Sequence, residues 1–341
     1  MSMNSIIEII TYFSAFLMAT GVITFCGSRL SKYGDIIAEK LGLSRTWIGV
    51  ILLATVTSLP ELITGISSVT YADVPDIALG DILGSCVFNL LILAFLDMQF
   101  RGSPVTSLAH HGHILSASLG ILLFIITALS LFLKDKIFPL GWIGPYTLIF
   151  ILTYFIGVKM IYIYEKRQFA RYIKEKAIEL KYEEISTKKA IIHYAINGFF
   201  VIITAIFLPI IGEGLAEATG LGQSFIGTIF IAMTTSLPEV VVTLSAAKIG
   251  AIDLAIGNLF GSNLFNIFIL GIDDILYVKG PLLYYVNENH IISALSASAM
   301  TSVAIMGLIY RAEKKNFFIA WDSLIIIMFY LINMMLLYTL R

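Results

Sequence analysis

The chain has 341 residues, of which 58% are hydrophobic and 13% charged, and its formal net charge is −1. Because an average soluble protein is about 45–50% apolar and about 25% charged, this composition excludes a soluble enzyme, a nucleic-acid-binding protein and a disordered chain. The sequence instead predicts an all-α polytopic membrane protein whose surroundings are the lipid bilayer, with no net charge that selects a macromolecular partner.

Ten stretches of the chain are long and apolar enough to cross a bilayer, which takes roughly 20 residues in a helix. They cover residues 5–28, 46–70, 75–98, 112–133, 138–162, 190–212, 222–247, 252–277, 290–310 and 317–340. The loops after the odd-numbered spans hold 18 of the 22 Lys and Arg residues. Because cytoplasmic loops are enriched in basic residues, both termini are expected on the extracytoplasmic side of the cell membrane.

One long polar stretch, from Tyr164 to Lys189, divides the apolar sequence into two halves. Its Lys, Arg and Glu residues alternate in a way typical of a solvated helix with ion pairs between successive turns. We therefore expect residues 164–189 to form a cytoplasmic linker helix between a first half, residues 1–163, and a second half, residues 190–341.

Several polar residues lie close to the ends of predicted spans, where we expect them in the hydrated interface. These are Asp97, His110, His111, His113, Asp273 and Asp274. A pH-sensing role is the alternative interpretation of the three histidines, because histidine titrates near neutral pH.

Two sequence blocks occur twice. ATVTSLPE at residues 54–61 returns as AMTTSLPE at 232–239, and GDILGSCVFNLLIL from Gly80 returns as GNLFGSNLFNIFIL from Gly257, with offsets of 178 and 177 positions. Five predicted spans separate the copies, and an odd number of crossings inverts the second copy in the membrane. Inverted repeats are typical of secondary transporters, whose substrate site lies at the midplane where the repeats meet.

Glu61 and Glu239 lie in the middle of otherwise uncharged spans, one in each copy. A carboxylate at this depth costs at least a few kcal/mol unless it faces a cavity or a partner. The cores of the second, third, seventh and eighth spans contain no Lys or Arg, so a bound cation is the predicted counter-charge. A structural role is the alternative.

Two carboxylates balance one divalent ion, and calcium takes about 6–8 oxygen ligands. Pro60 and Pro238 each leave the carbonyls about one turn earlier without a helical partner, so these carbonyls are available to an ion. Hydroxyl groups within one turn of the glutamates come from Thr57, Ser58, Thr235 and Ser236. No histidine accompanies the glutamates and Cys86 is isolated, which argues against a soft metal ion.

The second block places a serine and an asparagine four residues apart in each copy, on one helix face. The pairs are Ser85 with Asn89 and Ser262 with Asn266. We expect the asparagine amides to coordinate an ion or to cap a broken helix, while close helix packing is the alternative explanation for the serines.

Both blocks resemble the alpha repeats of the sodium/calcium exchanger family, within the calcium/cation antiporter superfamily, whose hallmark is TSLPE together with GNxxGSNxxN. The resemblance implies a fold of ten helices in two inverted five-helix repeats, with the second, third, seventh and eighth helices as the ion-binding core. It also implies that the first and sixth helices slide, so that the site opens to each side of the membrane in turn.

The resemblance further implies the ligands of each ion. Calcium is expected at Glu61, Glu239 and the carbonyls of Thr57 and Thr235. Sodium is expected at Ser58, Ser85, Ser236, Ser262 and the carbonyls of Ala54 and Ala232.

The sequence departs from the family pattern at the charged positions. Sodium-exchanging members often carry an Asp at the position of Asn89 or Asn266, and both are Asn in this chain. Conversely, Asp81 stands where the second copy has Asn258. We interpret Asp81 as a candidate third charged ligand, with a hydrated helix end just after Pro75 as the alternative.

These observations predict a compact, prokaryotic-type secondary antiporter, not an enzyme, that exchanges calcium for sodium and carries no cofactor. A calcium/proton antiporter of the same fold remains an alternative, although its branch of the superfamily resembles GNxxE instead of TSLPE in the first motif. A cation channel is the alternative of a different class.

Overall fold

The computed structural model describes residues 3–136, 138–175, 182, 184–219, 235–315 and 317–340. Within these ranges nine helical segments are long and apolar enough to cross a membrane. Eight are the helices α1 (Met3–Leu41), α5 (Pro75–Met98), α7 (His113–Phe132), α8 (Pro145–Glu175), α9 (Thr187–Thr219), α12 (Ile252–Leu276), α13 (His290–Tyr310) and α14 (Trp321–Thr339), and the ninth is a broken helix over Arg45–Ala72. The predicted span 222–247 runs across residues outside the described ranges, and its described part is the short helix α11 (Leu237–Lys248).

The helices extend beyond several predicted span ends. Helix α1 continues past residue 28 to Leu41, so the basic residues Arg29 and Lys32 lie on a helix and not in the predicted loop. It ends at Gly42, which has a left-handed φ of +62° that glycine adopts without steric cost. The expected start of α8 at residue 138 is also wrong, because residues 140–143 form an isolated β-bridge before the helix begins at Pro145.

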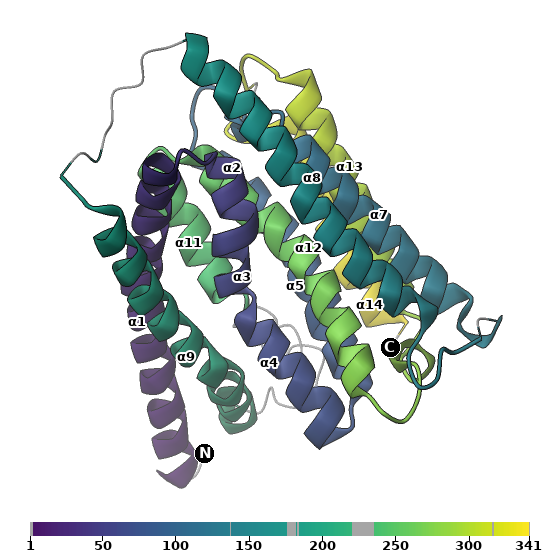
Figure 1. Ribbon diagram of the computed structural model, residues 1–341. Coiled ribbons are helices and arrows are strands. Elements are labelled where there is room, and N and C mark those ends of the chain that lie inside the picture. Colours follow the sequence, from purple (N-terminus) through teal and green to yellow (C-terminus); the bar gives the residue numbers. More distant parts are fainter. Residues whose placement is uncertain are drawn as a thin grey trace.

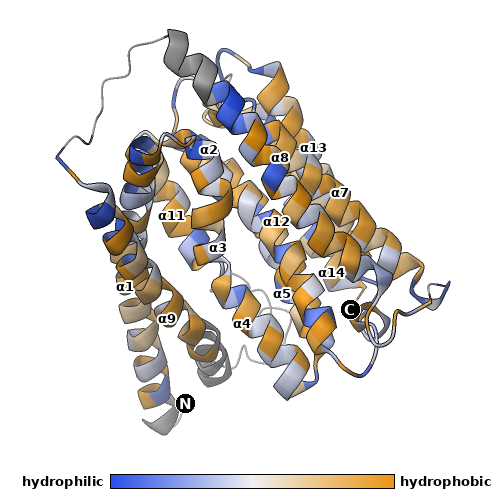
Figure 2. Cartoon of the chain, viewed as in Figure 1, coloured by the Kyte–Doolittle hydropathy of each residue, from blue (hydrophilic) through white to orange (hydrophobic). Residues whose placement is uncertain are grey.

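The helices form a central group flanked by two outer groups (Figure 1). Helices α1 and α9 run side by side at one edge, and α7, α8, α13 and α14 lie at the other. Helices α5 and α12 pack against each other between these two groups. Of their most apolar 18-residue stretches, 78% and 89% are buried, whereas the figure for α1 is 11%. Figure 2 shows apolar residues over the outward faces of the outer helices, as lipid contact requires.

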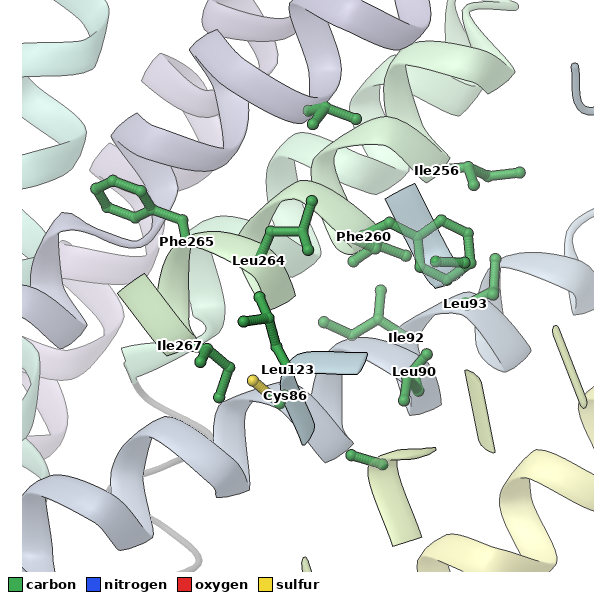
Figure 3. Packing of buried hydrophobic residues seen from close by; sticks show 14 of the residues in the cluster. Cys86, Leu90, Ile92, Leu93, Leu123, Ile256, Phe260, Leu264, Phe265 and Ile267 are labelled. Atoms are coloured by element: carbon green, nitrogen blue, oxygen red, sulfur yellow. The ribbon is translucent and has the colours of Figure 1, made fainter. Parts of the chain in front are cut away.

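The apolar centre of the molecule lies where α5 and α12 cross. Figure 3 shows Leu90 and Cys86 of α5 close to Phe260 and Leu264 of α12, with Leu123 of α7 beside them. These five side chains are at most 3% exposed. The central pair therefore forms a tightly packed frame, onto which the broken helices are set.

The second predicted span is broken at its middle. It consists of α2 (Arg45–Ile48), η1 (Gly49–Leu53), α3 (Ala54–Thr57), α4 (Leu59–Ser67) and η2 (Ser68–Ala72). The break falls at Ser58, whose φ and ψ are −93° and 10°, and the equivalent Ser236 has −82° and 6° immediately before α11. Pro60 and Pro238 occupy the second positions of α4 and α11, where the missing N–H is tolerated.

The η1 segment packs directly on the backbone of α12 because glycines line both sides of the contact. A Cβ atom on Gly49 would lie 2.6 Å from the carbonyl oxygen of Leu254. A Cβ atom on Gly261 would lie 2.3 Å from the carbonyl oxygen of Val50. These distances are too short for any side chain, so the approach of the broken helix to α12 requires glycine at these positions.

Replacing Gly261 with alanine is therefore expected to lower stability by about 1–3 kcal/mol, the usual cost of overpacking. The midpoint of thermal unfolding in detergent measures the change. Gly120→Ala is the matched control, since the nearest atom to its Cβ is Phe124 Cε2 at 3.9 Å, and alanine there should gain up to about 1 kcal/mol of helix propensity. Equal midpoints for the two variants would contradict this packing.

The prediction of one solvated helix over residues 164–189 is wrong. Helix α8 continues to Glu175 and α9 begins at Thr187, with residues 176–181 and 183 outside the described ranges. Tyr182 lies between them, and its hydroxyl donates to Asp35 of α1 at 3.0 Å. The extension of α1 beyond its predicted span supplies this partner.

Asp97, near the end of α5, is fully buried, which corrects its predicted interfacial position. Its carboxylate accepts the backbone N–H of Val105 at 2.9 Å and that of Ala320 at 2.8 Å. The ammonium group of Lys315, whose side chain is 1% exposed, lies 2.8 Å from the same carboxylate. Asp97 therefore holds loops from both halves of the chain at one end of the central pair.

Asp274 of α12 lies 177 positions after Asp97 and has the same role at the other end, so its predicted interfacial position is also wrong. It accepts the backbone N–H groups of Leu282 at 2.6 Å and Gly144 at 2.8 Å. The Tyr146 hydroxyl donates to it at 2.6 Å. The internal repeat therefore extends beyond the two sequence blocks to the aspartates that hold the loops at the ends of α5 and α12.

A histidine–aspartate pair also occurs twice. His113 Nε2 lies 3.1 Å from Asp253 Oδ1, and His290 Nε2 lies 3.1 Å from Asp76 Oδ1. Both partners are displaced by 177 positions, and each pair joins one repeat to the other. His113 is fully buried, so the predicted hydrated histidine cluster is wrong for this residue.

Candidate cation-binding site

The two glutamates of the repeated motif lie in the first turns of α4 and α11. Glu61 and Glu239 are each 1% exposed. The two short helices run in opposite directions and begin near the middle of the bundle (Figure 1). A helix N-terminus carries partial positive charge, so each break stabilises the carboxylate that follows it.

Serine hydroxyls from both repeats converge on these carboxylates. Glu239 Oε1 accepts hydrogen bonds from Ser58 at 3.1 Å and from Ser262 at 3.5 Å. Glu61 Oε1 accepts a hydrogen bond from Ser85 at 3.4 Å. Within the described residues, Oε2 of each glutamate is buried and has no hydrogen-bond partner. Each carboxylate thus keeps a lone-pair face open at the centre of the molecule.

The two threonines beside the breaks make equivalent contacts. Thr57 Oγ1 lies 3.3 Å from Asn258 Oδ1, and Thr235 Oγ1 donates to Asp81 Oδ1 at 3.2 Å. Because Asp81 and Asn258 are equivalent positions of the repeat, each threonine reaches the opposite repeat in the same way. Asp81 is buried, at 6% exposure, and does not lie at a hydrated helix end.

Two further contacts close the cluster. Thr57 Oγ1 lies 3.4 Å from Ser262 Oγ, and the Ser236 hydroxyl donates to Ser85 Oγ at 3.2 Å. All four side chains are fully buried. The serines and threonines that the sequence singles out are therefore brought together around the two glutamates.

The predicted asparagines lie one helical turn beyond the serines, and both are buried. Asn89 Nδ2 donates to Asn263 Oδ1 at 3.0 Å, while Asn89 Oδ1 has no hydrogen-bond partner among the described residues. Asn266 lies beside the thiol of Cys86. Asn263 was not among the predicted site residues, because the first copy has Cys86 at the equivalent position. Its place in the GSNxxN motif was the signal that could have identified it.

The two predicted alanine carbonyls have different outcomes. The carbonyl of Ala54 accepts the backbone N–H of Ser58 at 3.0 Å and lies 3.3 Å from Thr57 Oγ1. Ala232 lies outside the described residues. The contribution of Ala54 to an ion site would therefore require its carbonyl to bind the ion alongside these donors.

The donor set suits a hard cation. Among the described residues, no Lys, Arg or His forms an ion pair with Glu61, Glu239 or Asp81. Nor do three His, Cys, Asp or Glu side chains in the described ranges converge as a metal cluster. Carboxylate and hydroxyl oxygens without nitrogen or sulfur are ligands for calcium or sodium rather than zinc or copper.

Comparison with known proteins agrees with this geometry. The sodium/calcium exchanger protein family matches residues 11–164 and 189–339. Sodium/calcium exchanger MaX1 of Methanosarcina acetivorans is 27% identical over 338 residues, covering 90% of this chain and 93% of the relative. Inner membrane protein YrbG of Escherichia coli is 24% identical over 253 residues, covering 73% of this chain and 74% of the relative.

The fold is that of a solved sodium-calcium exchanger. A structure of NCX_Mj soaked with 10 mM Na⁺ and zero Ca²⁺ superimposes with a TM-score of 0.72 and 19% identity, covering 96% of this chain and 99% of the other. This likeness confirms the predicted all-α membrane fold of about ten helices in two repeats. The family match covers most of the chain, and the chain is therefore a member of the sodium/calcium exchanger family, a multi-pass membrane cation antiporter.

Proposed function

We propose that the protein exchanges calcium for sodium by alternating access. Calcium is held by Glu61 and Glu239 together with the carbonyls of Thr57 and Thr235. The observation that carries the proposal is the meeting of two buried glutamates from inverted repeats, each with an unpartnered oxygen and without a Lys or Arg ion-pair partner among the described residues. One divalent ion balances both charges.

Sodium takes the positions that the serines surround. Ser58, Ser85, Ser236 and Ser262 supply neutral oxygens next to the carboxylates, and the carbonyls of Ala54 and Ala232 complete the sodium ligands. Because both ions use the same two glutamates, calcium and sodium cannot occupy the site independently, and this competition is what couples their movements.

Helices α1 and α9 are the moving pair. Helix α1 contacts α11 of the core through small polar groups: the hydroxyls of Ser28 and Ser245 lie 2.9 Å apart, and Ser31 donates to the Val242 carbonyl at 2.8 Å. Only 11% of the most apolar 18-residue stretch of α1 is buried against the rest of the protein. Sliding of this pair along α11 would expose the glutamates to one side and then to the other.

The protein lies in the cell membrane with both termini outside. In this orientation the halves 1–163 and 190–341 are joined on the cytoplasmic side by residues 164–189, and the distribution of Lys and Arg supports it. The cargo consists of inorganic calcium and sodium ions, and no cofactor takes part.

A calcium/proton antiporter is the second candidate function, and Asp81 is the observation that favours it. This third carboxylate of the site, bonded to Thr235 at 3.2 Å, adds a negative charge where the second repeat has the neutral Asn258. A proton is one of the cations that can neutralise it.

Transport by the purified protein in lipid vesicles tests these functions. Vesicles loaded with sodium and diluted into choline buffer should take up ⁴⁵Ca²⁺, and a sodium ionophore should abolish the uptake. Uptake that depends only on a proton gradient would assign calcium/proton exchange instead. Downhill calcium flux that needs neither gradient would identify a channel and overturn both antiport functions.

A further inference from the structure

Asp273, near the end of α12, is a buried carboxylate that the repeated site does not use. It is fully buried, and neither carboxylate oxygen has a hydrogen-bond partner among the described residues. Its predicted place in the hydrated interface is therefore wrong. The adjacent Asp274 has a different environment, because backbone and hydroxyl donors surround it. A charge as isolated as that of Asp273 is costly at membrane depth.

The carboxylate of Asp273 lies against the backbone of α4. A Cβ atom on Gly65 would lie 2.3 Å from Asp273 Oδ2, so only glycine leaves room for it. Gly65 follows Glu61 by four residues and shares its helix face. Asp273 therefore lies one turn of α4 away from the repeated site, toward the end of α12.

In the second repeat, different residues fill the position that corresponds to the space beside Gly65. Thr243 is the counterpart of Gly65, and Asn258 is the counterpart of Asp81. Asn258 Nδ2 donates to Thr243 Oγ1 at 3.2 Å, which closes that space with a neutral hydrogen bond.

In the first repeat, the carboxylate of Asp273 takes the place of the threonine. Its partner across the space is Asp81, whose Oδ2 is buried without a hydrogen-bond partner in the described residues. Asp81 Oδ1 and Asn258 Oδ1 both face a threonine hydroxyl, so by the symmetry of the repeat Asp81 Oδ2 corresponds to Asn258 Nδ2, the atom that bonds to Thr243. An amide and a hydroxyl bond directly, whereas two carboxylates repel each other unless a positive charge lies between them.

We propose that Asp81 and Asp273 form a second calcium position, beside the repeated site and on the route from it to the end of α12. Its donors are oxygens only, and two carboxylates balance one divalent ion. Within the described chain no Lys, Arg or His forms an ion pair with Asp273. Because Thr235 bonds to Asp81, the two positions are joined directly. The choice of calcium rests on the proposed function.

Equilibrium binding of ⁴⁵Ca²⁺ to the purified protein, in sodium-free choline buffer, tests the proposal. We expect two calcium ions per wild-type chain and one per Asp273→Asn chain. The double variant Glu61→Gln with Glu239→Gln should also retain one ion, which Asp273→Asn then removes. One ion per chain in both wild type and Asp273→Asn would overturn the second position and leave a shared proton between the carboxylates.

A variant that copies residues of one repeat into the equivalent positions of the other controls for loss of folding. Gly65→Thr, Asp81→Asn and Asp273→Leu together copy the equivalent residues Thr243, Asn258 and Leu96, all of which are buried in the wild-type chain. This chain should unfold at a temperature close to that of the wild type and bind one calcium ion. Two ions in this variant would contradict the proposal. Failure of the proposed function would show separately, as unchanged calcium binding in the Glu61 and Glu239 double variant.

Discussion

Glu61→Gln or Glu239→Gln is expected to abolish sodium-driven calcium uptake into vesicles. Each change removes one of the two charges that balance the ion while preserving side-chain shape. Removing one partner from a buried charge pair costs about 3–5 kcal/mol, which lowers calcium affinity by roughly 100-fold or more. The serines that now donate to each carboxylate would still find an amide oxygen, so folding should be nearly unchanged.

Glu288→Gln is the matched control for these two variants. Glu288 is the same residue type, but its side chain is 64% exposed and pairs with Lys134 at 3.4 Å. Exposed pairs contribute about 0–1 kcal/mol, so its uptake should equal that of the wild type. Near wild-type uptake by either site variant, at equal protein incorporation, would refute the assignment of calcium to these glutamates.

Asp97→Asn is expected to cause the largest loss of stability, about 3–5 kcal/mol, because it leaves the charge of Lys315 buried without its counter-charge. The ammonium group would keep only carbonyl partners, among them that of Phe100 at 2.7 Å. The midpoint of thermal unfolding of the purified protein measures the loss.

Asp274→Asn provides the comparison within the same molecule. This carboxylate caps the equivalent loops but is bonded to backbone N–H groups and hydroxyls, and no lysine in the described part of the chain forms an ion pair with it. The amide should cost about 1–3 kcal/mol through one mismatched hydrogen-bond donor. Equal losses in the two variants would show that loop capping, rather than the buried charge of Lys315, dominates at Asp97.

The positions of the membrane spans could be predicted from the sequence because the bilayer sets both the length and the polarity of a spanning helix. The bilayer does not set where a helix stops once it reaches water. Helix α1 therefore runs on to Gly42, and α8 runs into the predicted linker. Helix ends of this kind depend on local breakers and on contacts such as that of Tyr182 with Asp35.

The centre of the candidate site could also be predicted, because the duplicated blocks name the same residue types twice and proline marks each break. Sequence position was misleading for Asp97, Asp273 and Asp274. Distance from a span end predicts contact with water only where no loop folds back over the helix. At Asp97 a loop does fold back, from more than 200 residues away, and no local pattern records such a contact.

The same contact has a consequence for how the chain is made. Asp97 accepts the N–H of Ala320, 223 residues further along, and Asp274 accepts that of Gly144, 130 residues earlier. During synthesis, the first five helices must therefore wait in the membrane with Asp97 incompletely bonded until nearly the whole chain has emerged from the ribosome. Two separately expressed halves are therefore expected to complete the bonding of Asp97 and Asp274 only by assembling with each other.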